Sequence, residues 1–138
     1  MTIDHIGIAV KDIEKSIQYW VNMFGYHKAT EVVLNTRQKV NVAFLEKNDS
    51  LTIKLIEPSE ESSSISNFTK RGGGIHHLCF KTSNMEKKIV ELHKKGMIKL
   101  AAPQPGEAFN NELIAFLFGR DNINIEIIET DKKAKRIL

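Results

Sequence analysis

The sequence contains a single cysteine, Cys79, among 138 residues. It cannot close an internal disulfide bond, so a disulfide-stapled scaffold and a cysteine-rich zinc module are both excluded. No apolar run is long enough to cross a bilayer, and residues 1–5 lack the basic-then-apolar layout of a secretion signal. With 41% hydrophobic and 27% charged residues, the composition is that of a single-domain globular protein, expected in a reducing cytoplasm.

Most of the chain also lacks an excess of either positive or negative charge. The formal net charge is +3, and residues 131–138, with four basic residues and one acidic residue, carry all of it. A nucleic-acid-binding protein would need its cations clustered on the folded body, so we expect neither nucleic acid nor a membrane as a partner. We expect residues 131–138 to form a solvated basic tail, with contact to an acidic partner as the alternative.

What the sequence does contain is an internal repeat at an offset of 72 residues. Thirteen of the 58 pairs formed by residues 1–58 and 73–130 are identical, including His5 with His77 and Phe44 with Phe116. Ordinary residue usage would give about four identities. We therefore predict one domain over residues 1–130, built from module one (1–58), a linker (59–72) and module two (73–130).

Each module shows the same order of secondary-structure signals. A β-branched run comes first, followed by a helix start at Asp12 or Asn84, whose side chains can accept the free amide hydrogens of a first turn. Apolar residues at helical spacing follow, and Gly25 and Gly96 are plausible ends. The strands expected after the helices are residues 28–34, 38–46, 50–57, 98–101, 112–118 and 122–129. We predict an α+β fold of two tandem βαβββ modules, forming an open, cup-like mixed sheet with the helices outside.

The linker and its glycines have a structural interpretation. Residues 58–64 are polar with turn chemistry, and we expect residues 64–70 to add one short helix. Gly72, Gly73 and Gly74 precede a strand rather than a helix, so we interpret them as a hinge and not as a phosphate-binding loop.

Four polar residues occupy equivalent positions of the two modules. Strand alternation turns His5 away from the apolar face of residues 6–10, and His77 and Cys79 lie on the matching face of module two. Lys54 and Glu126 are repeat mates that face away from the apolar residues beside them, where Leu51, Ile53 and Leu55 form the expected core set of module one. A twofold-like pairing of the modules would bring His5, Lys54, His77 and Glu126 together, and polar residues in mid-strand are costly unless they pair or bind something.

These motifs resemble the vicinal oxygen chelate superfamily, which includes glyoxalase and bleomycin-resistance proteins. The resemblance lies in residues 3–10, residues 74–78, residues 114–117 and residues 125–127, and it is strongest for methylmalonyl-CoA epimerases and next for glyoxalase I. It implies paired βαβββ modules, often assembled as homodimers, and a small-molecule substrate. In its metal-dependent members, ligands come from the first and last strand of each module.

The resemblance implies a set of metal-ligand positions, and this sequence departs from the family pattern at one of them. His5, His77 and Glu126 match ligand positions, and such a set suits divalent Co, Ni, Zn, Mn or Fe. Lys54 stands where the family usually has Glu or Gln, and an ammonium is no ligand. Either a metal is held by the other three residues, or the ammonium of Lys54 fills the place of the ion and pairs with Glu126.

The implied activity is that of an isomerase, epimerase or lyase acting on a small oxygen-rich substrate through a metal-stabilised enolate. Glu126 would then be the catalytic base, and Lys54, with its pKa lowered by burial, the second acid/base. A metal-free binding or resistance protein and an iron-dependent dioxygenase are the alternatives. The inner strand at residues 40–43 lacks the glutamate that the epimerases use, and residues 118–120 lack their His-Pro-Lys, which weakens the case for coenzyme A.

Two further residues are candidate substrate contacts. Arg120 would meet an anionic group, or is a plain exposed turn residue. Phe109 would line the pocket from the loop 103–111, where the family has a substrate-covering loop, unless this loop is a simple connection. His76 is interpreted as structural and on the core side, Gln38 as a rim residue, and Cys79 as a small buried residue rather than a reactive thiolate.

Overall fold

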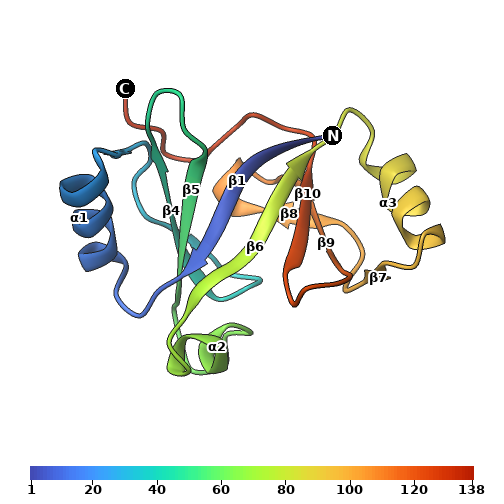
Figure 1. Cartoon of the computed structure of the whole chain (residues 1–138), viewed down its shortest axis with the longest axis horizontal. Coiled ribbons are helices and arrows are strands. Elements are labelled where there is room, and N and C mark those ends of the chain that lie inside the picture. The colour runs from blue at the N-terminus through green and yellow to red at the C-terminus, as the bar shows by residue number, and fades with distance from the viewer.

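The computed structural model describes all 138 residues, and its elements follow the predicted order twice (Figure 1). Module one contains β1 (Thr2–Ala9), α1 (Ile13–Phe24), β2 (His27–Lys28), β3 (Val33–Asn35), β4 (Val40–Glu46) and β5 (Thr52–Pro58). The linker contains α2 (Ser66–Lys70). Module two contains β6 (Gly74–Lys81), α3 (Met85–Lys94), β7 (Ile98–Lys99), β8 (Gln104–Gly106), the 3₁₀ turn η1 (Glu107–Phe109), β9 (Glu112–Phe118) and β10 (Asn124–Ile128).

All ten strands form one mixed sheet, which confirms the predicted fold class. The order along the sheet is β2-β4-β5-β1-β6-β10-β9-β7, with β3 beside β4 and β8 beside β9. The modules meet where β1 pairs antiparallel with β6, while β5 and β10 run parallel to their module's first strand. The first and last strands of both modules are therefore the four central strands, as the repeat predicts.

Helix boundaries follow from local chemistry. The side chain of Asp12 accepts a hydrogen bond from the Lys15 amide at 3.1 Å, and Gly25 ends α1 in the left-handed conformation with φ of 74°. Asn84 caps α3 in the same way, accepting from the Lys87 amide at 3.0 Å. The two caps, which are repeat mates, start both helices at the predicted residues.

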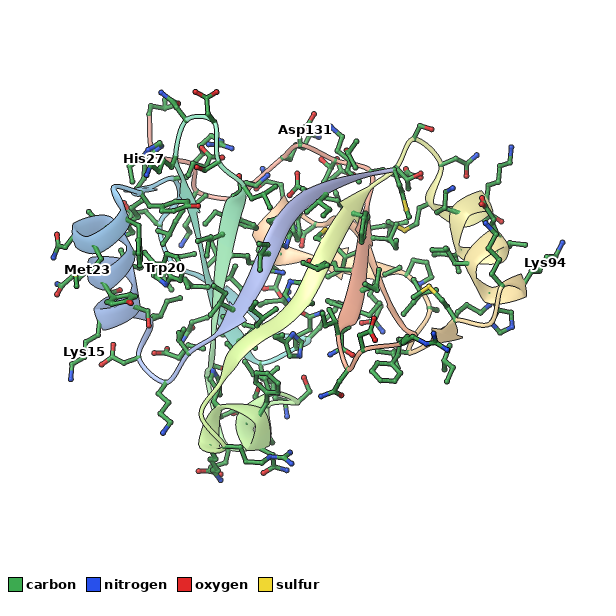
Figure 2. All side chains as sticks on the ribbon, viewed as in Figure 1. Lys15, Trp20, Met23, His27, Lys94 and Asp131 are labelled. Carbon is green, nitrogen blue, oxygen red and sulfur yellow. The ribbon has the colours of Figure 1, made fainter.

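Helices α1 and α3 cover opposite ends of the sheet (Figure 1). Ile13 and Ile17 of α1 pack on Ile53 and Leu55 of β5, and Figure 2 shows Trp20 directed toward the sheet while Met23 points away from it. Met85 and Ile89 of α3 form the corresponding cluster in module two. A third and larger cluster, with Phe44 and Phe109 in it, fills the inside of the cup. No helix is both long and apolar enough to span a bilayer.

Two details of the sequence prediction are wrong. Leu51, expected in the core of module one, is 44% exposed, because β5 begins at Thr52, two residues later than expected, and Leu51 lies just before the strand. The expected strand 28–34 is instead two short strands, β2 and β3, that contact β4 at different places.

The basic tail is docked rather than solvated, which corrects the prediction for residues 131–138. The amides of Ala134 and Ile137 donate to the carbonyls of Ala108 and Ala29 at 2.8 and 2.9 Å, so the segment bridges both modules. Arg136 donates two hydrogen bonds to the carboxylate of Glu46 at 2.9 and 3.0 Å. Figure 1 shows this segment, the C-terminal strap (residues 131–137), running from β10 across one edge of the cup toward β4.

Candidate functional site

The four residues singled out by the repeat meet inside the cup. His5 of β1 and His77 of β6 place their Nε2 atoms 3.0 and 3.3 Å from the Oε1 atom of Glu126 in β10. The ammonium of Lys54 in β5 lies 3.3 Å from Oε2 of the same carboxylate. All four residues are at most 1% exposed. They converge because each central strand turns one face inward and contributes one polar residue at that point.

Two β-bulges shape the site, and they occur at equivalent places of the repeat. In the pairing of β1 with β6, Asp4 is skipped between Ile3 and His5, and His76 is skipped between Ile75 and His77. A bulge lets neighbouring side chains of one strand turn toward the same side. Asp4 and His76, which are repeat mates, thereby each come to lie against the histidine that follows them.

Asp4 fixes the tautomer of His5. Its Oδ2 atom lies 2.8 Å from Nδ1 of His5, and a carboxylate can only accept, so Nδ1 carries the proton. In a neutral His5 the Nε2 atom then presents a lone pair to Glu126 Oε1. Two lone pairs 3.0 Å apart repel each other unless a proton or a cation lies between them.

His77 is buried away from water, and its imidazole is neutral. Burial lowers the pKa of His77 to about 3, outweighing the opposing influence of Glu126. Its Nδ1 atom lies 2.9 Å from Nδ1 of His76, while its Nε2 atom makes no hydrogen bond although it faces Glu126. A neutral buried imidazole with an unpaired nitrogen is a ready ligand or acceptor.

The carboxylate of Glu126 stays charged. Burial alone would raise its pKa, but the charge of Lys54 and the contacts with His5 and His77 outweigh burial and hold the pKa well below its usual value. The Lys54 ammonium also lies 5.1 Å from the ring centroid of Phe109, an attractive cation–π arrangement. The site therefore keeps one negative and one positive charge in contact away from water.

A cavity of about 370 Å³ opens beside the site on the side of α2. Lys54 and His77 reach it from the floor, and Phe116 and Ile56 form apolar walls. Its other polar lining is mostly neutral: Gln38, Ser64, His76, Gln104 and Asn124. A small ligand would meet amide and hydroxyl groups along the walls and charge only at the floor.

Sequence reasoning missed part of this lining. His76, interpreted as structural and core-facing, lines the cavity, because its bulge cancels the strict alternation on which that interpretation relied. Asn124, whose side-chain nitrogen lies 3.2 Å from His76 Nε2, also lines the cavity, and nothing in the sequence points to this residue. No local signal in the sequence marks the bulge, although the consecutive histidines at 76 and 77 are a hint.

The two predicted substrate contacts lie apart from the cavity walls. Phe109 is fully buried, with its ring centroid 6.1 Å from that of His5 in a stacked arrangement, so it supports the site from behind. Arg120 is exposed in the turn between β9 and β10. Cys79 is fully buried, and burial raises the pKa of its thiol, as expected of an unreactive cysteine.

The donor set fits a divalent transition ion. Ligand atoms of His5, His77 and Glu126 all lie within 4.8 Å of one another, and two imidazoles with one carboxylate are typical ligands of such ions. A cation among them would also satisfy the unpaired Nε2 atom of His77 and the opposed lone pairs at His5. A protonated Lys54 has no lone pair to donate and borders this place as a second positive charge.

Comparison with known proteins places this geometry in a family. The model of the glyoxalase/bleomycin resistance protein/dioxygenase superfamily matches residues 4–116. The uncharacterized protein YqjC of Bacillus subtilis is 31% identical over 130 residues, which cover 92% of this chain and 91% of YqjC.

Solved structures agree with the family match. Methylmalonyl-CoA epimerase from Mycobacterium tuberculosis aligns with a TM-score of 0.82 at 30% identity, covering 93% of this chain and 87% of its own. A Streptomyces coelicolor methylmalonyl-CoA epimerase variant in complex with 2-nitronate-propionyl-CoA aligns with a TM-score of 0.83 at 27% identity, covering 95% and 98%. With its tandem modules, its central strands and this match over most of its length, the chain belongs to the glyoxalase/bleomycin resistance protein/dioxygenase superfamily.

Proposed function

We propose that the chain is an epimerase that removes and returns a proton next to a thioester or similar carbonyl, with a methylmalonyl-CoA-like molecule as the candidate substrate. The observation that carries the proposal is the buried convergence of His5, His77, Glu126 and Lys54, of which His77 and Lys54 line the cavity. The similarity to methylmalonyl-CoA epimerases over most of the chain supports this substrate class.

His5, His77 and Glu126 would hold a divalent transition ion, such as Co, Ni, Zn, Mn or Fe. When bound, such an ion polarises neighbouring substrate oxygens and stabilises an enolate. Asp4 and His76 would orient the two imidazoles through their Nδ1 atoms, as second-layer partners of ligating histidines generally do.

Glu126 and Lys54 would move the proton. A carboxylate oxygen of Glu126 takes the proton from the carbon beside the carbonyl, and the electron pair of that bond moves into the enolate. Because Lys54 and Glu126 are in contact, both lie on one side of the substrate, and the Lys54 ammonium returns a proton to the opposite face of the planar enolate carbon after the enolate has turned in the cavity. Transfer of the first proton from Glu126 to the Lys54 amine, across their 3.3 Å contact, restores both groups.

Arg120 and Phe109 have supporting parts in the proposal. Arg120, exposed at the turn after β9, would meet a phosphate of a large anionic handle outside the cavity. Phe109 would keep Lys54 in place by stacking against His5 and by its cation–π contact with the ammonium.

Isotope exchange tests the function. Methylmalonyl-CoA is incubated with the chain in deuterated buffer, and deuterium uptake at its acidic carbon is followed by mass spectrometry. We expect uptake to fall by about 10²–10⁴-fold in Glu126→Gln, the range for loss of a general base. Glu91→Gln, on the surface of α3, is the control and should match the wild type. No uptake above the uncatalysed rate by the wild type, with and without added Co²⁺, would overturn the proposal.

A second candidate is a metal-free protein in which Lys54 takes the place of the ion. The contact between its ammonium and both oxygens of Glu126, at 3.3 and 3.4 Å, favours this candidate. Metal analysis of protein purified without chelator separates the two. One equivalent of a transition ion that disappears in His5→Ala supports the metal-dependent enzyme. Deuterium uptake that persists after chelator treatment supports the Lys54-based one.

We also propose that the chain forms a homodimer, as the family resemblance predicts. Figure 1 shows α1 and α3 at opposite ends of the sheet, with β1 and β6 between them. Ile3 and Ile75 of these strands are 40% and 58% exposed, which leaves apolar surface for a second copy.

A further inference from the structure

The internal repeat relates the cavity to a second place in the cup. Four residues that line the cavity are Val40, His76, Ala101 and Phe116. Their counterparts at the offset of 72 are Glu112, Asp4, Ala29 and Phe44. The repeat therefore predicts two equivalent openings, one on each side of the four central residues. The cavity is the first, and the place bordered by Glu112, Asp4, Ala29 and Phe44 is called the second mouth.

Residues of the C-terminal strap contact each of the four residues that border the second mouth. Lys132 Nζ lies 2.9 Å from Oε1 of Glu112, and the Ile137 amide donates to the carbonyl of Ala29 at 2.9 Å. Lys133 makes the two inner contacts: its ammonium lies 3.6 Å from Oδ2 of Asp4 and 5.2 Å from the ring centroid of Phe44. All four of these counterparts are thus in contact with the strap.

In two of the four pairs burial differs between the two mouths in the way that a plug would cause, while Glu112 is more exposed than its buried mate Val40. Phe44 is 1% exposed and Ala29 is 2% exposed, whereas their mates Phe116 and Ala101 are half-buried and exposed. The side chain of Lys133 is itself only 6% exposed. The mouth on the His76 side has no such segment over it and forms the cavity.

The inner end of the strap also reaches the site through a chain of contacts. Lys133 pairs with Asp4, Asp4 accepts from Nδ1 of His5, and Nε2 of His5 faces Glu126. Lys133 therefore contacts the carboxylate that sets the His5 tautomer.

We propose that the C-terminal strap is a built-in plug of the second mouth, with Lys133 as the residue that seats it. Ligands then reach Glu126 only from the His76 side, and water is kept from Asp4 and His5. Lys133 is a positioning residue in this arrangement, because it acts on His5 through Asp4 and not on a substrate. The two equivalent openings then differ in function, because the cavity receives the ligand and the strap closes the second mouth.

Cys79 is a natural reporter of this plug. Its sulfur lies within 4.8 Å of the polar atoms of His5 and of Asp4, the residue that Lys133 of the strap contacts, and it is the only cysteine. Alkylation by N-ethylmaleimide, a neutral reagent, is followed by mass spectrometry in the folded full-length chain. Lys133→Glu places a like charge beside Asp4 and should raise the alkylation rate by at least about tenfold, since labelling follows the population of the open form. Lys135→Glu, the same charge change at an exposed position of the strap, should stay within about twofold of the wild type.

One further measurement keeps the test independent of activity and of any folding defect. In the unaltered full-length chain, the amides of Ala134 and Ile137 should resist hydrogen exchange because they donate to Ala108 and Ala29. Exchange of these amides at the rate of an unstructured peptide, or equal alkylation of Lys133→Glu and Lys135→Glu, would overturn the proposal.

Discussion

Lys54 is the residue at which this chain departs from the family pattern. An ammonium about 4 Å from a divalent ion is repelled by roughly 8 kcal/mol at an effective dielectric constant of 20. In Lys54→Gln, which removes the charge and keeps a polar end, we therefore expect Co²⁺ to bind at least about tenfold more tightly. Competition with a metal-chelating dye measures the affinity. Lys94→Gln, on the outer side of α3 (Figure 2), is the control; unchanged or weaker binding in Lys54→Gln would contradict the metal-site proposal.

His77 makes the stability of the metal-free protein depend on pH. Its pKa is about 3 in the folded chain, whereas an unfolded histidine titrates near 6.5. Between these values the unfolded state binds one proton more, so the free energy of unfolding should fall by about 1.4 kcal/mol per pH unit as the pH drops. Glu126, whose pKa is lowered by folding, adds a loss in the same direction below its unfolded pKa near 4.5.

Urea unfolding of chelator-treated protein between pH 6 and pH 4 measures this slope. His77→Gln should reduce it by close to one proton, and His93→Gln, at an exposed position of α3, should leave it unchanged. Equal slopes in the wild type and His77→Gln would show that His77 is not held neutral in the folded chain.

At the scale of the strand, Gly7 of β1 makes room for the ring of His77. A Cβ atom at Gly7 would lie 2.0 Å from Cε1 of that ring, far inside contact distance. Gly7→Ala should therefore displace the His77 ring, destabilise the fold by about 1–3 kcal/mol and weaken Co²⁺ binding by about tenfold or more. Gly119→Ala, where the nearest atom is the flexible end of Met97 at 3.3 Å, is the control. Thermal unfolding and dye competition report both effects, and normal metal affinity in Gly7→Ala would contradict the placement of the ring.

The sequence predicted the elements and the central site for the same physical reason. The repeat and strand alternation identify His5, Lys54, His77 and Glu126 as inward-facing mates, and the structure brings all four together. Alternation fails only where the strands are irregular: the bulge at His76 carries this residue into the cavity, against the prediction. Bulges depend on pairing between strands far apart in the sequence, and no periodicity within one strand records them.

At the scale of the whole molecule, the composition of the strap does not predict that it docks on the folded body. Four basic residues among the last eight are typical of a solvated end, and this was the expectation. Each of Lys132, Lys133 and Arg136 instead finds an acidic partner on the folded body. Residues 1–130 are neutral in sum, yet their acidic groups at the second mouth are arranged to receive the strap, and only the fold brings these groups together.

Whole-molecule assembly gives the last prediction. A stable dimer buries about 800 Å² on each partner, and the outer face of β1 and β6 offers apolar side chains at the centre of the sheet, among them Ile3 and Ile75. We expect sedimentation to show a dimer and Ile75→Lys to shift it toward the monomer, because a charge would be buried without a partner at the interface. Val90→Lys, at a position of α3 that is 47% exposed, is the matched control and should leave the dimer intact. A monomeric wild type at micromolar concentration would contradict the dimer, and an unchanged dimer in Ile75→Lys would place the interface elsewhere. Because the strap crosses one edge of the cup and Ile75 lies on the outer face, Ile75→Lys should leave the protection of Cys79 unchanged, which separates assembly from the chemistry of the site.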